Sequence, residues 1–181
     1  DSFFAVLKRK GEPAATLIAK PVDDGSPASE APIVAVALDL NTAQGQLAEL
    51  LRTTVDRIIE KSPDARVACL NVLKLNRIAM DTSLDEEGQN KHVQRLVGLK
   101  DWAHPLKLAA GRVTFHVLAA VDPADAILEY CRSNHVDHVV MGARENSAMR
   151  KLLGSVSGKV AAEAPCSVTV VRARSEADDE N

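Results

Sequence analysis

The stretch VVMGARENSAMRKLLGSVSGKV, residues 139–160, contains the clearest structural signals in the chain. An apolar run ends at Gly142, a basic segment follows, and a glycine–serine pair at 154–155 precedes a run with helical spacing. A strand that leads through a loop into a helix is the repeating unit of α/β proteins. We therefore predict a strand over 137–143 and a helix over 155–164.

Strand and helix patterns alternate on both sides of this stretch. Near-continuous apolar runs predict four more buried strands, over residues 33–40, 65–75, 112–120 and 167–173. Apolar residues at helical spacing predict three more helices, over residues 41–62, about 92–108 and 121–134. The last of these has Asp122 as a plausible N-cap and Pro123 at its first position. This alternation indicates an α/β fold, a doubly wound parallel sheet with helices on both faces.

The composition is typical of one soluble domain. A chain of 181 residues is long enough for one domain with a full core and short for two. A hydrophobic fraction of 46% with only 3% aromatic residues fits a core of Val, Leu, Ile and Ala. Because no apolar run approaches the roughly 20 residues of a membrane span and no signal peptide is recognisable, we expect a cytoplasmic protein without membrane contact.

Cysteines and charge argue against several other classes of protein. Cys69, Cys131 and Cys166 are odd in number and widely spaced, so they form neither a disulfide framework nor a zinc ligand set. We expect reduced thiols that pack as small core residues. With 22 basic and 25 acidic side chains, the balance offers no electrostatic basis for nucleic-acid binding. We therefore predict neither a metal site nor a nucleic-acid partner.

The two ends of the chain differ in composition from its middle. Residues 1–31 combine short apolar patches with DDGSPASEAP at 23–32, which is typical of a linker. We expect an N-terminal extension whose first patch forms a short strand or helix against the domain. The last seven residues carry four acidic side chains and no basic one, which predicts a disordered tail over 174–181. The domain itself is assigned to residues 32–173.

The loop between the two glycines has features that suit a phosphate group. Gly142 directly after a strand lets a ligand approach the backbone closely. Gly154 and Ser155 at a helix start offer free N–H groups, a hydroxyl and the positive end of the helix dipole. Residues 143–159 carry four basic side chains and one acid. The alternative, a simple turn at Gly142 and an ordinary cap at Ser155, remains open at this point.

These residues resemble a known family. The family's signature is a strand that ends in Met-Gly, then Gly-x-x-Gly, nine residues and Gly-Ser or Gly-Thr, followed by a helix and a Pro-Cys-x-Val-x-Val-Val strand. The segment VVMGARENSAMRKLLGSVSGKVAAEAPCSVTVVR is similar to it, and IVAVALDL and CLNVL resemble the family's first two strands. Across 32–173 the chain resembles a universal stress protein (Usp) domain, especially the copies fused to Ser/Thr protein kinases. The missing initial Met and the linker-like start agree with a module cut from a longer protein.

The resemblance implies a five-stranded Rossmann-like domain, usually a homodimer joined by its last strand (167–173), with an AMP, ADP or ATP site in many members. Carried over by position, the site comprises Asp39, Val72, Met141, Gly142, Arg144, Glu145, Gly154, Ser155, Val156 and Ser157. Asp39 and Val72 would lie around the base. Met141 and Gly142 would lie beneath the ribose and phosphates, and the start of the helix would supply amides and hydroxyls to the phosphates.

Two departures from the signature weaken the expected phosphate site. Glu145 stands where the motif has its second glycine, and eight residues, not nine, separate it from Gly154. A carboxylate about 4 Å from a phosphate costs about 1 kcal/mol in water and several-fold more when partly desolvated. We therefore predict weak or conditional adenine nucleotide binding, with AMP or ADP favoured over ATP, in a regulatory or sensor domain. The alternative is a nucleotide-free interaction and dimerisation domain whose phosphate loop has decayed.

Other motifs give no support for catalysis or metal binding. GSVSGKV is one residue shorter than a Walker-type phosphate loop and lacks its Mg²⁺-binding hydroxyl. His135 and His138 flank the start of a predicted strand, where alternation sends them to opposite faces and no third ligand is visible. Because no general base, metal-ligand cluster or adenylation motif is recognisable, no enzyme activity beyond slow ATP hydrolysis is predicted.

Overall fold

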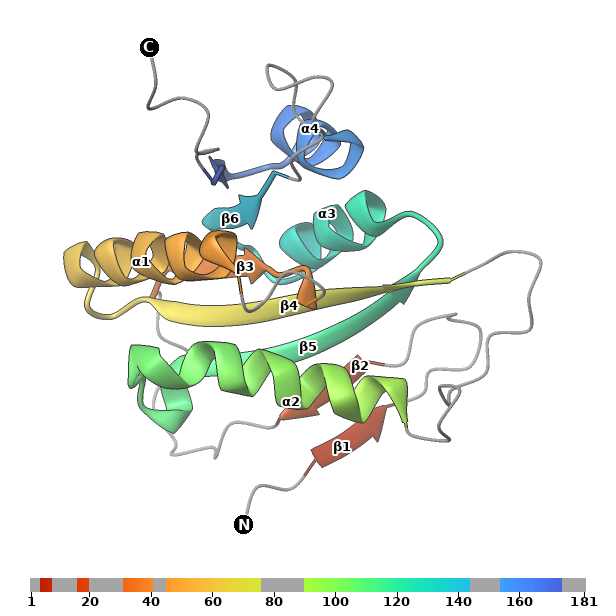
Figure 1. The fold of residues 1–181 in the computed structure, drawn as a ribbon, viewed down its shortest axis with the longest axis horizontal. Helices are drawn as coiled ribbons and strands as arrows, with labels where there is room; N and C mark the ends of the chain where they lie inside the picture. Colours follow the sequence, from red (N-terminus) through yellow and green to blue (C-terminus); the bar gives the residue numbers. More distant parts are fainter. Residues whose placement is uncertain are drawn as a thin grey trace.

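A five-stranded parallel sheet forms the centre of the protein in a computed structural model that describes residues 4–7, 16–19, 31–40, 45–75, 90–143 and 154–173. The strands are β3 (Ile33–Ala37), β4 (Arg66–Lys74), β5 (Val113–Ala120), β6 (His138–Gly142) and β7 (Ser167–Val171). Their order across the sheet is β5-β4-β3-β6-β7, and every neighbouring pair is parallel. Figure 1 shows β6 and the final helix at the opposite end of the sheet from β5.

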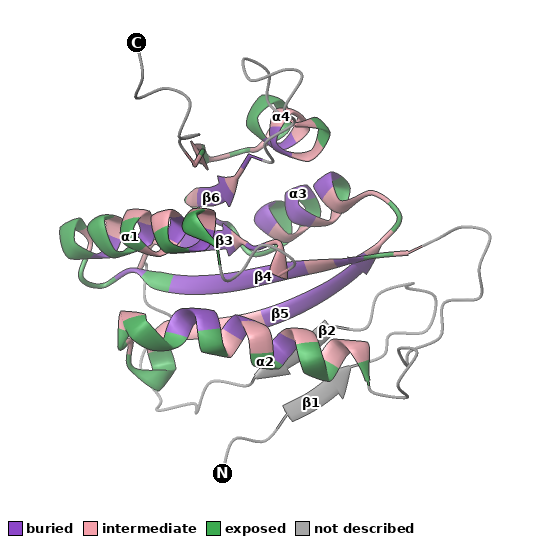
Figure 2. Cartoon of the chain, in the orientation of Figure 1, coloured by how far each residue is buried: buried purple, intermediate pink, exposed green. Residues whose placement is uncertain are grey.

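Helices cover both faces of this sheet, as the sequence predicts. They are α1 (Gln46–Lys61), α2 (Lys91–Ala103), α3 (Pro123–Ser133) and α4 (Ser155–Glu163). The helices α1 and α2 share one buried cluster, which includes Val55 and Leu99. The helices α3 and α4 share the other cluster, which includes Leu128 and Val160. In Figure 2, β4 and β5 are largely buried, and the helices are buried along one side and exposed along the other.

Two short strands are described before the main sheet. β1 (Phe4–Leu7) and β2 (Thr16–Ala19) pair antiparallel in a sheet of their own. β2 lies beside β5, at one edge of the main sheet (Figure 1). The first apolar patch corresponds to β1, so it is a short strand, one of the two alternatives that the sequence leaves open. Residues 20–30 and the acidic tail lie outside the described residues.

Two helix boundaries differ from the sequence-based prediction. The predicted helix over 92–108 ends as α2 at Ala103 and continues only as a short 3-10 turn, η2 (His104–Leu106). Pro105 explains this end, because it has no N–H to donate and its ring would clash with the preceding helical turn. A second 3-10 turn, η3 (Ala110–Arg112), leads into β5. The described part of α1 begins at Gln46, after Gly45 as N-cap.

The predicted cap of α3 is confirmed. The Asp122 side chain accepts a hydrogen bond of 2.9 Å from the Ala124 N–H, and Pro123 occupies the first helical position. The carboxylate thereby pairs one of the N–H groups that a helix start leaves without an intrahelical acceptor. The loop after β5 consequently turns directly into α3 at the carboxyl edge of the sheet.

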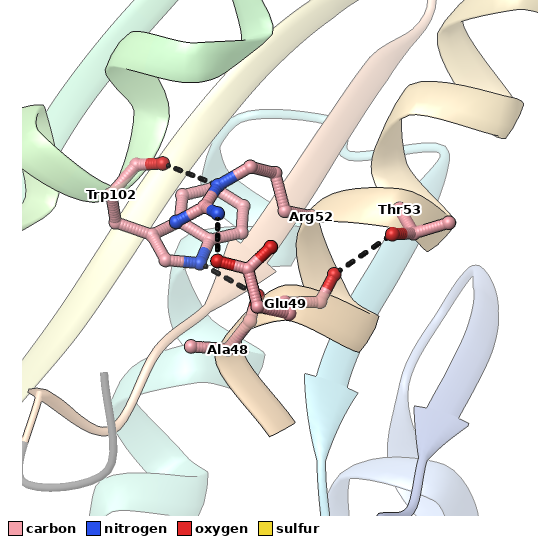
Figure 3. Close-up of polar contacts among 5 residues, drawn as sticks. All are labelled: Ala48, Glu49, Arg52, Thr53 and Trp102. Carbon is pink, nitrogen blue, oxygen red and sulfur yellow. Dashed lines mark hydrogen bonds and ion pairs between the residues drawn. The ribbon is translucent and has the colours of Figure 1, made fainter. Parts of the chain in front are cut away.

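A polar contact joins α1 to α2 (Figure 3). The Trp102 indole Nε1 donates to the Ala48 carbonyl at 3.1 Å, and Arg52 Nε donates to the Trp102 carbonyl at 3.0 Å. The Arg52 guanidinium also lies 5.7 Å from the centre of the indole ring and pairs with Glu49. These contacts hold α2 in a fixed position against α1, on the face of the sheet that both helices cover.

The cysteines are free thiols. Cys69 and Cys131 are buried, as predicted for core residues, whereas Cys166 is half-buried. Burial raises the pKa of the Cys69 thiol to about 12, which keeps it protonated and unreactive at neutral pH. In the described part of the chain, no helix is long and apolar enough to cross a membrane.

Candidate functional site

The sheet has one switch point, between β3 and β6. From β3 the chain passes through α1 to β4 on one side, and from β6 it passes through α4 to β7 on the other. The connections that follow these two strands therefore leave the sheet in opposite directions. In doubly wound sheets, ligands bind at this position. Asp39, which follows β3, and Gly142, which ends β6, both lie there.

Three of the predicted site residues pack together on one face of the sheet. Met141 is buried in the cluster shared by α3 and α4, and Val72 and Val156 pack against the same cluster. Ala35 and Ala37 belong to this face as well, whereas Val34, Val36 and Leu38 face α1 and α2. These three residues come from three separate elements, β4, β6 and α4, that border one apolar cluster.

Gly142 has a structural role that neither sequence-based interpretation anticipates. It is the last residue of β6 and pairs with Val171 of β7, so it is not a turn. Its backbone is not in the left-handed region, but a Cβ atom there would lie 2.7 Å from Cδ2 of Leu47 on α1. The absence of a side chain therefore lets the first turn of α1 pack against the end of β6.

The start of α4 presents backbone donors but only one solvent-facing hydroxyl. Gly154 is the N-cap, without a side-chain cap, and its carbonyl accepts the first helical bond from Gly158 at 2.7 Å. The N–H groups of the first turn consequently have no intrahelical acceptor. Ser155 is exposed, whereas Ser157 is 3% exposed and its hydroxyl donates to the Gly154 carbonyl at 3.3 Å. The Ser157 hydroxyl is therefore engaged within the helix.

The basic excess of the loop is smaller than its sequence suggests. Lys159 is one of the four basic side chains counted there, but its ammonium lies 2.7 Å from Asp125 and 2.9 Å from Asp122. Hydrogen bonds to Asp125 and then Asp122 hold the Lys159 pKa above its ordinary value. Its charge is thus shared with two carboxylates of α3 and its N-cap. Arg144 and Glu145 lie outside the described residues.

A buried polar residue near the end of β3, with a half-buried arginine as partner, has almost no signal in the sequence. Asn71 on β4 is 3% exposed, and its Nδ2 donates to the Leu38 carbonyl at 2.8 Å. Arg95 on α2 donates through Nη1 to Asn71 Oδ1, also at 2.8 Å. The one sequence signal is a polar residue inside the apolar run CLNVL. Its partners, 33 and 24 residues away, have no sequence signal.

The two histidines of HVDH do not form a metal site with each other. His135 is exposed and has a positive φ of 51°, in the turn before β6. His138 begins β6, is half-buried, and lies 2.7 Å from the Thr169 hydroxyl of β7. Within the described ranges there is no group of three or more His, Cys, Asp or Glu side chains that could hold a metal ion.

The strand order and the switch point between β3 and β6 define a Rossmann-like, doubly wound α/β domain. The chain belongs to the universal stress protein family, since the sequence model of that family matches residues 21–172. This family assignment confirms the resemblance seen in the loop and in the order of elements.

Comparison with individual proteins agrees with this assignment. A universal stress protein from Methanothermobacter thermautotrophicus is 43% identical over 56 residues, a segment that spans 31% of this chain and 38% of that protein. UspA from Lactobacillus plantarum superposes with a TM-score of 0.60 at 20% identity, covering 80% of this chain and 99% of the other. A family member from Arabidopsis thaliana with AMP bound has a TM-score of 0.55 at 18% identity, covering 83% and 97%. The two structures show a shared fold.

Proposed function

We propose that this domain is a regulatory module that binds an adenine nucleotide at the switch point between β3 and β6. The observation that supports the proposal is that Met141 lies in one buried apolar cluster and that Val72 and Val156, near the start of α4, pack against the same cluster. Apolar side chains there would contact the base and ribose, and the N–H groups of the first turn of α4 would receive a phosphate. The AMP complex of the Arabidopsis relative supports the choice of ligand.

The binding is proposed to be weak and to favour AMP or ADP over ATP. Each additional phosphate brings more negative charge toward the segment that contains Glu145. Lys159, already paired with Asp122 and Asp125, offers little free charge to compensate. The electrostatic repulsion between Glu145 and the ligand therefore rises with the number of phosphates, while the contacts to the base and ribose stay the same.

Nucleotide binding can be tested by titration. We would denature the purified protein, chromatograph the supernatant for released nucleotide, and titrate the emptied protein with AMP, ADP and ATP by calorimetry. Glu145→Gln is expected to tighten ATP binding more than AMP binding. Glu163→Gln, an exposed carboxylate at the other end of α4, is the matched control and should change neither. No binding at millimolar nucleotide would leave the nucleotide-free interaction domain as the better description.

We also propose that β7 joins two copies of the domain. β7 is an edge strand of the main sheet, and Val168, Val170 and Val171 along it remain half-exposed. Ser167 donates to Asp137 and Val171 accepts from Ala143, so the odd-numbered residues bond toward β6. The N–H and C=O groups of Val168 and Val170 consequently point to the free edge, where a second copy could pair with them.

The dimer proposal has its own test. Val170→Pro removes an outward N–H while leaving the bonds of Val171 and Ser167 to the β6 side in place. We expect the wild type to elute as a dimer in size-exclusion chromatography with light scattering, and Val170→Pro to elute as a folded monomer. Thr169→Val on the same strand is the control and should remain dimeric. A monomeric wild type at tens of micromolar would contradict the proposal.

A further inference from the structure

Asn71 interrupts an otherwise apolar row of β4. Val67, Cys69 and Leu73, on the same side of the strand, are buried in the cluster beneath α1 and α2. Asn71 is just as deeply buried, at 3% exposure. A buried amide costs a few kcal/mol unless its hydrogen bonds are made, so a residue of this kind in an apolar row needs a compensating role.

The compensating bond is made where β3 and β4 separate. The last paired residues of β3 and β4 are Ala37 and Leu70. The last backbone hydrogen bond runs from the Leu38 N–H to the Leu70 carbonyl, at 2.8 Å. A continuing ladder would next bring the Val72 N–H to the Leu38 carbonyl. That carbonyl instead accepts from Asn71 Nδ2 at 2.8 Å. The side chain of Asn71 thus satisfies the Leu38 carbonyl at the point where the β3–β4 pairing stops.

Arg95 determines which way the Asn71 amide points. A guanidinium has only donors, so the atom of Asn71 that faces Arg95 Nη1, at 2.8 Å, must be Oδ1. The NH₂ group is then left to face the Leu38 carbonyl. Arg95 is in turn placed by α2, which Trp102 and Arg52 hold against α1. One set of bonds therefore connects the packing of α2 to the last peptide of β3.

We propose that Asn71 and Arg95 are positioning residues for recognition of the nucleotide base, an inference that rests on the function proposed above. Asn71 binds the carbonyl of the peptide bond that joins Leu38 to Asp39. Asp39 is the residue expected to contact the base. Fixing that carbonyl fixes the direction in which the backbone enters Asp39. Asn71 and Arg95 act through the backbone, from the α1–α2 face, without touching the nucleotide themselves.

The test compares base selectivity with stability. Asn71→Asp keeps the shape and the partner Arg95 but cannot donate to the Leu38 carbonyl. Arg95→Met removes the donor to Oδ1, and Arg95→Lys restores one. Arg112→Met is the matched control, because Arg112 also bonds a backbone carbonyl next to β4, that of Ala65, at 2.9 and 3.2 Å at the amino end of the strand. For each variant we would measure the ratio of ADP to GDP affinity by calorimetry and the thermal unfolding midpoint.

We expect Asn71→Asp and Arg95→Met to lower the ratio of ADP affinity to GDP affinity about tenfold. This change corresponds to the loss of one hydrogen bond. Arg95→Lys should recover most of the ratio, and Arg112→Met should lower the unfolding temperature without changing the ratio. If the wild type binds ADP and neither variant changes the ratio, the inference is wrong and the proposed function stands. An equal loss in Arg112→Met would also overturn it, as a general effect of stability. A wild type that binds no nucleotide overturns both.

Discussion

A Cβ atom on Gly142 would lie 2.7 Å from Cδ2 of Leu47, so the end of β6 and the first turn of α1 meet without space for a side chain. This contact gives a structural reason for a glycine at the end of β6. A glycine after a strand suggests close approach of a ligand, but packing alone already requires it at this position. The same contact brings the start of α1 to the rim of the proposed nucleotide site.

Gly142→Ala is expected to destabilise the domain by about 1–2 kcal/mol, because the new methyl group overpacks against Leu47. Leu47→Ala opens the space that the methyl group needs. The double variant should therefore lose less stability than the sum of the two single variants, which urea denaturation can measure as a coupling free energy. Strict additivity would show that Leu47 moves away without cost and that the glycine is kept for another reason.

Trp102→Phe is expected to cost about 1–3 kcal/mol, since the hydrogen bond from Nε1 to the Ala48 carbonyl is lost and the smaller ring leaves part of the buried indole space unfilled. Trp102 is the only tryptophan in the chain, so unfolding should be followed by far-UV circular dichroism. Val93→Ala, a 52% exposed position on the same helix, is the control and should be close to neutral. A neutral Trp102→Phe would contradict a structural role for the α1–α2 contact.

The order of strands and helices could be predicted because it depends on local patterns. Buried parallel strands read as apolar runs, and the Asp122–Pro123 start of α3 is a local capping signal that the structure confirms. The predicted C-terminal end of α2 was wrong, because it was placed several residues too late. Apolar residues continue at helical spacing to Leu106 and Leu108, and the prediction followed this spacing. Pro105 nevertheless ends the α-helix.

From chemistry alone the sequence indicates the candidate site at two strand ends and at the Gly154–Ser155 helix start, and the other site residues come from the family resemblance. Asp39 and Gly142 follow apolar runs, so the rule for parallel sheets finds them. The contacts that shape the site join residues far apart in sequence: Leu47 with Gly142, Arg95 with Asn71, and Lys159 with the α3 start. Each depends on how helices pack on the sheet, and one sequence contains no periodic signal for such pairs.

His116 should make the domain less stable as the pH falls from about 6.5 to about 4. Its Nε2 lies 2.9 Å from the Thr114 hydroxyl and 3.1 Å from that of Tyr130, while Nδ1 is buried with no partner among the described residues. Burial lowers the His116 pKa from 6.5 to about 4. The unfolded chain therefore binds a proton in this range that the folded protein does not, so stability rises with pH. The loss on acidification is expected to reach about 3 kcal/mol at most.

Urea denaturation of His116→Gln at several pH values checks this expectation. The variant can be less stable at pH 7, but its stability should fall less steeply between pH 6.5 and 4 than that of the wild type. His104→Gln, an exposed histidine after α2, is the control and should keep the wild-type slope. Equal slopes for wild type and His116→Gln would assign the acid sensitivity to other groups.

We expect Asp122 to stabilise the start of α3 mainly as a cap and less as an ion-pair partner, because the ion pair is half-exposed. Its carboxylate accepts from the Ala124 N–H at 2.9 Å and from Lys159 Nζ at 2.9 Å. Asp122→Ala removes both bonds and should cost about 1 kcal/mol, the usual loss for an N-cap. Asp122→Asn keeps an oxygen for the Ala124 N–H and should cost less. Lys159→Gln should resemble Asp122→Asn, because the pair is half-exposed and screened by salt.

The pH and salt dependence of these variants separates the two roles. The Lys159 hydrogen bond, and next the Ala124 amide, hold the Asp122 pKa below its ordinary value. Its contribution to stability is therefore present above the unfolded pKa and is lost as the pH falls through the folded pKa. High salt should narrow the difference between wild type and Lys159→Gln but leave the deficit of Asp122→Ala largely intact. If high salt removed the deficit of Asp122→Ala, the ion pair would outweigh the cap.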